Sequence, residues 1–123
     1  MKKIYLGIPF SGIEELSFKC ANEVASLLIA NKNIVFSPIS HTYPIWKTNM
    51  VEHTYEIWLE QDKSFVEWAD EIYMINIISE DFYGIDKIAN SKGCQMEINW
   101  AKELKKPISF IKYKMNTKEI ENV

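Results

Sequence analysis

The chain has 123 residues, 47% of them hydrophobic, which is enough for one domain with a real core. All 14 basic residues are lysine and the formal net charge is −3, so the clustered basic surface that a polymeric nucleic acid requires is absent. No run approaches the ~18 apolar residues of a membrane span, and the apolar run near the N-terminus is too short for a signal peptide. We therefore expect a cytoplasmic protein that binds neither polymeric nucleic acid nor membranes.

Three elements are predicted in the first 36 residues. Ile4–Ile8 is a short apolar run stopped by a proline, as expected of a buried strand. In the turn that follows, Ser11 and Glu14 have the spacing of a capping box, and an apolar stripe of helical period comes next. Ile34–Phe36 is predicted to be a second buried strand.

The segment Ile39–Glu52 is predicted to be irregular, and it is unusually aromatic. His41, Tyr43 and Trp46 stand close to Pro44. A loop of this length within a compact domain is usually functional or disordered. The rings favour an ordered flap over a flat ligand, and the alternative is that they pack as a satellite of the core.

Neither the histidines nor the cysteines form a metal motif. His41 and His53 have no third ligand at a supporting spacing. Cys20 and Cys94 both fall on predicted buried helix faces, so we interpret them as reduced core thiols and not as a disulfide. The sequence predicts no metal site and no cofactor.

Helical periodicity returns over Thr54–Ala69, where one acid interrupts the apolar face. Asp62 lies in the middle of that stripe, and such a group is either neutralised by a partner or held for function. Glu71–Ile78 is then predicted to be a strand, and its apolar second half indicates that both of its faces are covered. The polar stretch Ser79–Asn90 is predicted to be a loop.

A second acid lies on the predicted helix Ser91–Leu104. Ser91 is a suitable N-cap, and Gly93 lets another group approach the helix N-terminus, where an anion can bind. Glu97 falls on or beside the apolar face, where a carboxylate is costly to bury unless something pairs with it or uses it. The alternative is a surface helix whose Glu97 reaches water. The run Ile108–Tyr113 is predicted to be a fourth strand.

Strands that alternate with helices predict an α/β fold. We expect a small parallel sheet of four to five strands with helices on both faces, Rossmann-like or flavodoxin-like. Residues 1–113 form the single domain and residues 114–123 a polar C-terminal tail, frayed or docked on a partner. Ligands in such sheets bind beyond the carboxyl ends of the strands, here at the loops Ile8–Gly12, Ser37–Glu52 and Ser79–Ser91.

The absence of three common motifs disfavours nucleoside triphosphatases, dinucleotide oxidoreductases and serine hydrolases. No G-x-x-x-x-G-K loop occurs, no G-x-G-x-x-G follows the first strand and no serine has a G-x-S-x-G setting. Asp62 and Glu97 remain as the candidate catalytic groups. Paired carboxyl groups suit glycosidic cleavage, in which one attacks or stabilises the anomeric carbon while another group handles protons. Like charge between them would raise the pKa of one acid and could keep it protonated near neutral pH.

One set of motifs extends over about residues 3–112: Ile4-Tyr5-Leu6-Gly7, Asp62 with Asp70, Ser91-x-Gly93-x-x-x-Glu97, Ala101 and Lys106-Pro107. In this combination the chain resembles the nucleoside 2-deoxyribosyltransferase superfamily, which includes small deoxynucleoside 5′-monophosphate N-glycosidases and cytidylate hydrolases. The run Phe36-Ser37-Pro38-Ile39-Ser40-His41 is similar to an uncharacterised bacterial and phage branch of that superfamily.

The resemblance implies a role for each matching residue. Glu97 would be the nucleophile that attacks C1′, Asp62 would orient it or assist proton transfer, and Tyr5 would hydrogen-bond it. A serine such as Ser91, together with the first loop, would hold a 5′-phosphate, but the arginine that phosphate-binding relatives often carry is missing. Whether a 5′-phosphate is required therefore stays open. We expect the base to lie between three rings of the aromatic segment, and the full substrate-binding set to be Gly7, Pro9, Phe10, Ser11, Gly12, His41, Tyr43, Trp46, Ser91 and Gly93.

The sequence thus predicts an N-glycosidase or glycosyl transferase that acts on a nucleoside or nucleoside 5′-monophosphate. Base identity, ribose or deoxyribose, and hydrolysis or transfer stay open. The competing class is a non-catalytic protein that senses or sequesters a nucleotide-derived signal; a scaffold that lost its chemistry is disfavoured because both acids are present. Aromatic density across Tyr43–Trp68 and the resemblance both predict a homodimer or higher oligomer, with the helix that carries Trp58 and Asp62 near a two-fold contact.

Overall fold

A five-stranded sheet forms the centre of the protein. The computed structural model describes residues 1–50, 55–78 and 88–122. The strand order is β2-β1-β3-β4-β5, in which the first four strands are parallel and the last pairs antiparallel with its neighbour. The strands are β1 (Lys3–Gly7), β2 (Ile34–Phe36), β3 (Glu71–Ile78), β4 (Ile108–Lys114) and β5 (Glu119–Asn122).

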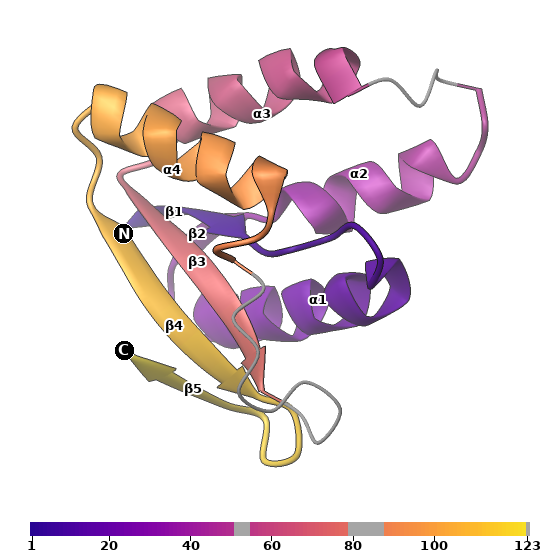
Figure 1. Cartoon of the computed structure of the whole chain (residues 1–123). Helices are drawn as coiled ribbons and strands as arrows, with labels where there is room; N and C mark the ends of the chain where they lie inside the picture. Colours follow the sequence, from indigo (N-terminus) through magenta and orange to yellow (C-terminus); the bar gives the residue numbers. More distant parts are fainter. Residues whose placement is uncertain (51–54, 79–87, 123) are drawn as a thin grey trace.

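Helices cover both faces of this sheet. In Figure 1, α3 and α4 lie together over one face, while α1 lies on the other and α2 runs beside it. This arrangement confirms the predicted α/β fold with a mostly parallel sheet. The helices are α1 (Glu14–Ala30), α2 (Pro38–Trp46), α3 (Tyr55–Trp68) and α4 (Lys92–Glu103).

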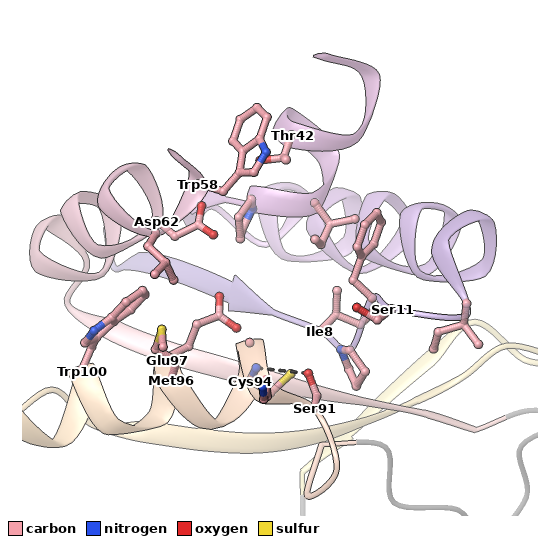
Figure 2. Close-up of a pocket in the computed structure, with 18 of the residues that line it drawn as sticks. Ile8, Ser11, Thr42, Trp58, Asp62, Ser91, Cys94, Met96, Glu97 and Trp100 are labelled. Atoms are coloured by element: carbon pink, nitrogen blue, oxygen red, sulfur yellow. Dashed lines mark hydrogen bonds between the residues drawn. The ribbon is translucent and has the colours of Figure 1, made fainter. Parts of the chain in front are cut away.

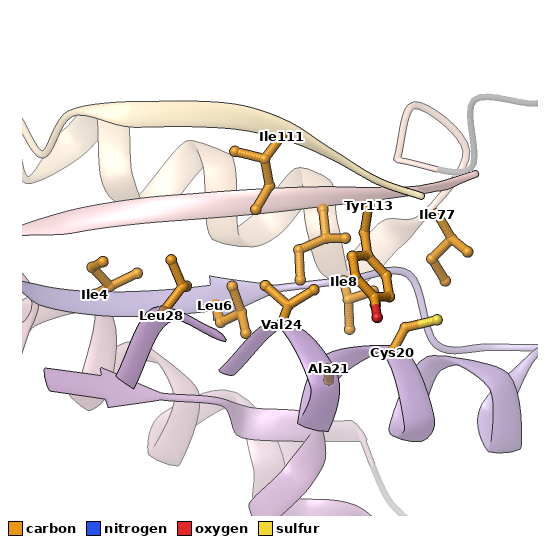
Figure 3. Packing of buried hydrophobic residues seen from close by; sticks show 11 residues of the cluster. Ile4, Leu6, Ile8, Cys20, Ala21, Val24, Leu28, Ile77, Ile111 and Tyr113 are labelled. Carbon is orange, nitrogen blue, oxygen red and sulfur yellow. The ribbon is translucent and has the colours of Figure 1, made fainter. Parts of the chain in front are cut away.

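The alternation of side chains along β1 divides the core into two clusters. Successive residues of a strand point to opposite faces. Ile4 and Leu6 pack with α1, in the cluster that Figure 3 shows, which also holds Cys20, Val24 and other residues. Tyr5 lies on the opposite face, in the second cluster, among residues of α3, β3 and α4. The same alternation therefore builds the core and directs a phenol toward α4.

The aromatic segment is a helix where the sequence analysis expected an irregular flap, so that expectation was wrong for residues 38–46. Pro38 occupies the first helical turn, where its missing N–H costs nothing and its fixed φ favours the helix. Pro44 lies inside the helix, a position that costs about 3 kcal/mol. Packing offsets this cost, because the Tyr43 ring contacts Phe18 of α1 and its hydroxyl donates to Glu15. Residues 51–54, which include His53, lie outside the described part of the chain.

The capping box predicted for Ser11 and Glu14 does not form. The N-cap of α1 is Ile13, which makes no side-chain capping bond. Its backbone N–H instead donates to the Phe10 carbonyl at 3.1 Å, closing a turn in which Gly12 has φ of +85°. The left-handed region favours glycine, so this residue sets the shape of the first loop.

The C-terminal segment forms a strand where a frayed or partner-docked tail was expected. β5 pairs with β4 over four residues, from Lys114–Glu119 to Ile111–Asn122. The polar composition of the tail did not predict a strand. An edge strand with one solvated face needs few apolar residues, so composition alone does not reveal it. Ile120 supplies the apolar contact, packing against the cluster on the α1 side of the sheet.

Replacing Ile120 tests whether β5 contributes to stability. Ile120→Ala should lower the free energy of unfolding by about 1–3 kcal/mol, less than a fully buried isoleucine, because this side chain is only partly buried. Urea denaturation followed by circular dichroism measures the change. The exposed residue Glu119 of the same strand provides the control, and Glu119→Ala should stay within about 0.5 kcal/mol of the wild type. Equal stability of all three proteins would show that the strand does not stabilise the domain.

Candidate active site

A cavity of about 850 Å³ opens between α2, α3, α4 and the loop that follows β1. Its size suits a small-molecule ligand. Figure 2 shows side chains from all of these elements directed into one space at the carboxyl end of β1. This is the edge at which parallel α/β sheets bind ligands. The predicted third loop is only partly described, because residues 79–87 lie outside the described part of the chain.

Glu97 lies on the buried face of α4, beside Cys94, Ile98 and Ala101, and only 8% of its surface is exposed. Its Oε2 accepts a hydrogen bond from the hydroxyl of Tyr5, which is itself fully buried on β1. The bond joins two positions that are 92 residues apart. Glu97 therefore does not reach out to solvent along the helix surface, which was the alternative left open by the sequence.

Asp62 lies in the middle of α3 and lines the same cavity as Glu97. In Figure 2 the two carboxyl groups extend from facing helices into the space between them. Asp62 is half-buried, and no lysine pairs with it among the salt bridges of the described residues. The structure thus brings together the three residues Tyr5, Asp62 and Glu97 that the sequence analysis selected as catalytic.

Burial changes the ionisation of both acids. Desolvation raises the pKa of Glu97 to about 8; the hydrogen bond from Tyr5 opposes this shift, and the charge of Asp62 adds to it. Desolvation also raises the pKa of Asp62 to about 7. Burial, together with the charge of Glu97, raises the pKa of Tyr5 well above its ordinary value, so its hydroxyl keeps its proton and remains a donor. Near neutral pH the two acids together retain at least one proton.

The N-terminus of α4 forms one rim of the cavity. Ser91 is its N-cap, accepting a hydrogen bond from the backbone N–H of Cys94 at 3.2 Å. Lys92 and Gly93 also line the cavity, as do Pro9, Phe10 and Ser11 of the first loop. Gly12 is not among the lining residues. This rim offers backbone N–H groups, hydroxyls and one ammonium to a ligand.

Of the three rings expected to enclose a base, only Trp46 lines the cavity. Tyr43 is buried and donates to Glu15 at 2.6 Å, while its ring packs on Phe10 with centroids 5.4 Å apart. Its ring also stacks on that of Trp46 with centroids 5.9 Å apart, so Tyr43 packs against two side chains of the cavity lining. His41 is exposed, and its ring lies 5.6 Å from that of Phe36. Gly7 does not line the cavity either, but it lies directly beside the Glu97 carboxyl.

Sequence reasoning missed several residues of the cavity wall. Trp58 lies one helical turn before Asp62, and Trp100 lies three residues after Glu97, so helical spacing from the two acids could have identified both. In the described part of the chain no acceptor pairs with the indole N–H of Trp58. The other lining residues without a predicted role are Ile8, Ile13, Pro38, Ile39, Thr42, Leu59, Asn90, Lys92, Cys94 and Met96.

We also searched the described residues for side chains that could bind a metal ion. Over residues 1–50, 55–78 and 88–122, no cluster of three or more His, Cys, Asp or Glu side chains could hold a metal ion. Cys20 and Cys94 are free and buried, in different core clusters. None of the helices within those ranges is long and apolar enough to cross a membrane.

Two solved structures have a similar fold. One is the 2-deoxyribosyltransferase of the psychrotolerant bacterium Bacillus psychrosaccharolyticus, with a TM-score of 0.63 and 24% identity over 92% of this chain and 74% of that one. The other is the 2-desoxiribosyltransferase of Leishmania mexicana, with a TM-score of 0.59 and 14% identity over 92% of this chain. This chain spans 65% of the Leishmania protein. The likeness confirms that the fold is of the nucleoside 2-deoxyribosyltransferase type.

A comparison with curated protein sequences finds no match. The family described as a domain of unknown function, DUF1937, matches residues 2–113, which include all of β1 to β4 except Lys114 and every residue that lines the cavity. The protein is therefore a member of the DUF1937 family.

Proposed function

We propose that this protein cleaves or transfers at the N-glycosidic bond of a nucleoside or nucleoside 5′-monophosphate, through Glu97 as the nucleophile. The observation that carries the proposal is the buried Glu97 carboxyl, held by Tyr5 and facing Asp62 across one cavity. Two acids at a ligand-sized cavity are the arrangement that glycosidic cleavage needs. The shared fold with 2-deoxyribosyltransferases supports the same reaction class.

The chemistry follows from the two oxygens of Glu97. Tyr5 donates to Oε2, which leaves Oε1 to attack C1′ of the sugar. As the new ester bond forms, the C1′–N bond breaks and its electron pair goes to the base, which takes a proton from the carboxyl group of Asp62. Water or a second base then attacks C1′ and gives its proton to the Asp62 carboxylate, while the C1′–O bond of the ester breaks and Glu97 leaves as a carboxylate.

This mechanism needs one proton on the acid pair. Glu97 must be ionised to attack, while Asp62 must be protonated to assist the leaving base. The pKa of Asp62 is about 7 and that of Glu97 about 8, so in the free protein the single remaining proton lies mainly on Glu97, and the reactive form, with the proton on Asp62, is the minor one. The Tyr5 hydroxyl favours the ionised form of Glu97 and so increases the share of this reactive form.

The cavity walls suit the parts of such a substrate. Trp46, Trp58 and Trp100 provide flat apolar surfaces for a base. Ser91 and Lys92 at the N-terminus of α4 provide polar groups for the 5′ end of the sugar, whether it carries a hydroxyl or a phosphate.

Replacing Glu97 tests the nucleophile. Glu97→Gln should keep the fold but lower turnover at least about 10³-fold, because the amide cannot form the glycosyl ester. Purified protein is incubated with the common nucleosides and their 5′-monophosphates, and released base is measured by chromatography. Glu103→Gln, an exposed glutamate of the same helix, is the control and should remain active. Tight binding of an intact nucleotide, without base release by the wild type, would replace the enzyme with a sensor or sequestering protein.

The raised pKa of Glu97 also predicts how stability depends on pH. The unfolded state ionises this group near its ordinary value of 4.5, whereas the folded state holds the proton up to about pH 8. The unfolded state therefore binds fewer protons in this window, and stability should fall as the pH rises from 5 to 8. Glu97→Gln should reduce that fall by more than about 1 kcal/mol. Thermal or urea unfolding at several pH values measures the effect, and identical slopes in both proteins would contradict it.

The assembly prediction remains a proposal of its own. On α3, Ile57 is 39% exposed next to Trp58, so this helix presents apolar surface beside the cavity. We expect a homodimer with α3 near the two-fold axis, and light scattering at micromolar concentration measures the mass. A constant mass near 14.4 kDa over a wide dilution range would refute the dimer. Ile57→Lys should weaken the dimer, whereas Ile29→Lys, at an exposed isoleucine of α1, should not.

A further inference from the structure

Gly7 and Met74 meet directly beneath the Glu97 carboxyl. In the parallel pairing of β1 with β3, Gly7 and Met74 are register partners, so their side-chain positions lie on the same face. A Cβ built on Gly7 would lie 2.6 Å from the sulfur of Met74, 2.8 Å from its methyl carbon and 3.2 Å from Oε1 of Glu97. The thioether therefore occupies the space that a side chain at position 7 would fill, and because the Glu97 carboxyl approaches the same point, the Met74 sulfur and Oε1 of Glu97 lie no more than about 6 Å apart.

The Glu97 side chain has only one hydrogen-bonded anchor among the described contacts, the Tyr5 hydroxyl on Oε2. A single anchor leaves the carboxyl free to swing about that bond. Met74 is fully buried on the sheet side of this carboxyl, where the missing side chain of Gly7 leaves room for its thioether. An unbranched thioether is suited to filling so irregular a space.

We propose that Met74 is a positioning residue for Glu97: its thioether, for which the missing side chain of Gly7 leaves room, supports the carboxyl from the sheet side and holds it at the cavity. The inference rests on the proposed function for its catalytic consequence only. The placement of Glu97 itself can be measured without turnover.

The same contact keeps water away from the carboxyl. Met74 and Gly7 belong to the sheet floor and offer no polar side chain to Glu97. A smaller residue at position 74 would leave a void beside a carboxyl group, a place that water can enter. The desolvation that raises the pKa of Glu97 would then weaken.

The test compares three single variants on β3. Met74→Ala should lower the pKa of Glu97 toward the ordinary range of glutamate, measured by NMR titration of ¹³C-labelled glutamate carboxyls. It should also lower kcat about tenfold or more with little change in KM, because misplacing the nucleophile affects the reacting step. Met74→Leu keeps most of the volume and should retain the wild-type titration. Ile75→Ala is the control, because Ile75 is equally buried but belongs to the cluster on the opposite face of the sheet.

A second experiment changes the same contact by a substitution on β1, so it does not require Met74→Ala to fold. Gly7→Ala places a methyl group 2.6 Å from the Met74 sulfur and 3.2 Å from Oε1 of Glu97, so it should displace Met74, crowd Glu97 directly as well and lower kcat. In the double variant Gly7→Ala/Met74→Ala, the fold-loss in kcat should be smaller than the product of the fold-losses in the two single variants. The reason is that the added methyl group enters the space that the Met74 side chain has vacated.

The outcomes separate the two proposals. If the wild type releases no base from any nucleoside, the proposed function fails, while the NMR titration still decides whether Met74 positions Glu97. An unchanged Glu97 titration in both Met74→Ala and Gly7→Ala overturns the positioning role. Equal changes in Ile75→Ala also overturn it, because they would trace the effect to loss of packing anywhere along β3.

Discussion

The site depends on one hydrogen bond, between the Tyr5 hydroxyl and the Glu97 carboxyl. It links β1 to α4 and anchors one oxygen of a carboxyl group that is almost fully buried at the cavity. Two effects oppose each other here: burial disfavours the ionised form, and the hydrogen bond favours it. Burial is the larger, so the pKa of Glu97 rises to about 8 and the acid is held close to its ionisation point at neutral pH.

This arrangement is hard to explain as a structural device. A structural acid in a core is usually paired with a cation, which lowers its pKa and adds stability above pH 4. Glu71 behaves in this way: it pairs with Lys2 at 2.8 Å, and its pKa is lowered. Glu97 faces a phenol and a second acid, and its raised pKa makes the folded state less stable as the pH rises. A position that costs stability in this way is expected where the acid is used in chemistry.

Local periodicity was enough to predict the β-α alternation and the two acids, because each acid interrupts an apolar stripe on its own helix. It was not enough for side chains whose direction depends on tertiary contacts. Tyr43 looked like a ligand-binding ring, but its hydrogen bond to Glu15 on α1 turns it away from the cavity. The proximity of Met74 to Gly7 could not be predicted either, since it depends on the register between β1 and β3.

The charges around the cavity set the orientation that a substrate of the proposed reaction would take. Among the described residues that line it, Lys92 is the one cation, whereas Asp62 and Glu97 are both acids. A phosphate would be repelled by the acid pair and attracted to Lys92 and the N-terminus of α4. The base would then lie toward Trp58 and Trp46, with the sugar over Glu97. Without an arginine in the chain, the hold on a phosphate is weaker than a bidentate guanidinium would give. The charges around the cavity therefore favour one orientation of such a substrate, but they do not decide whether the substrate carries a phosphate.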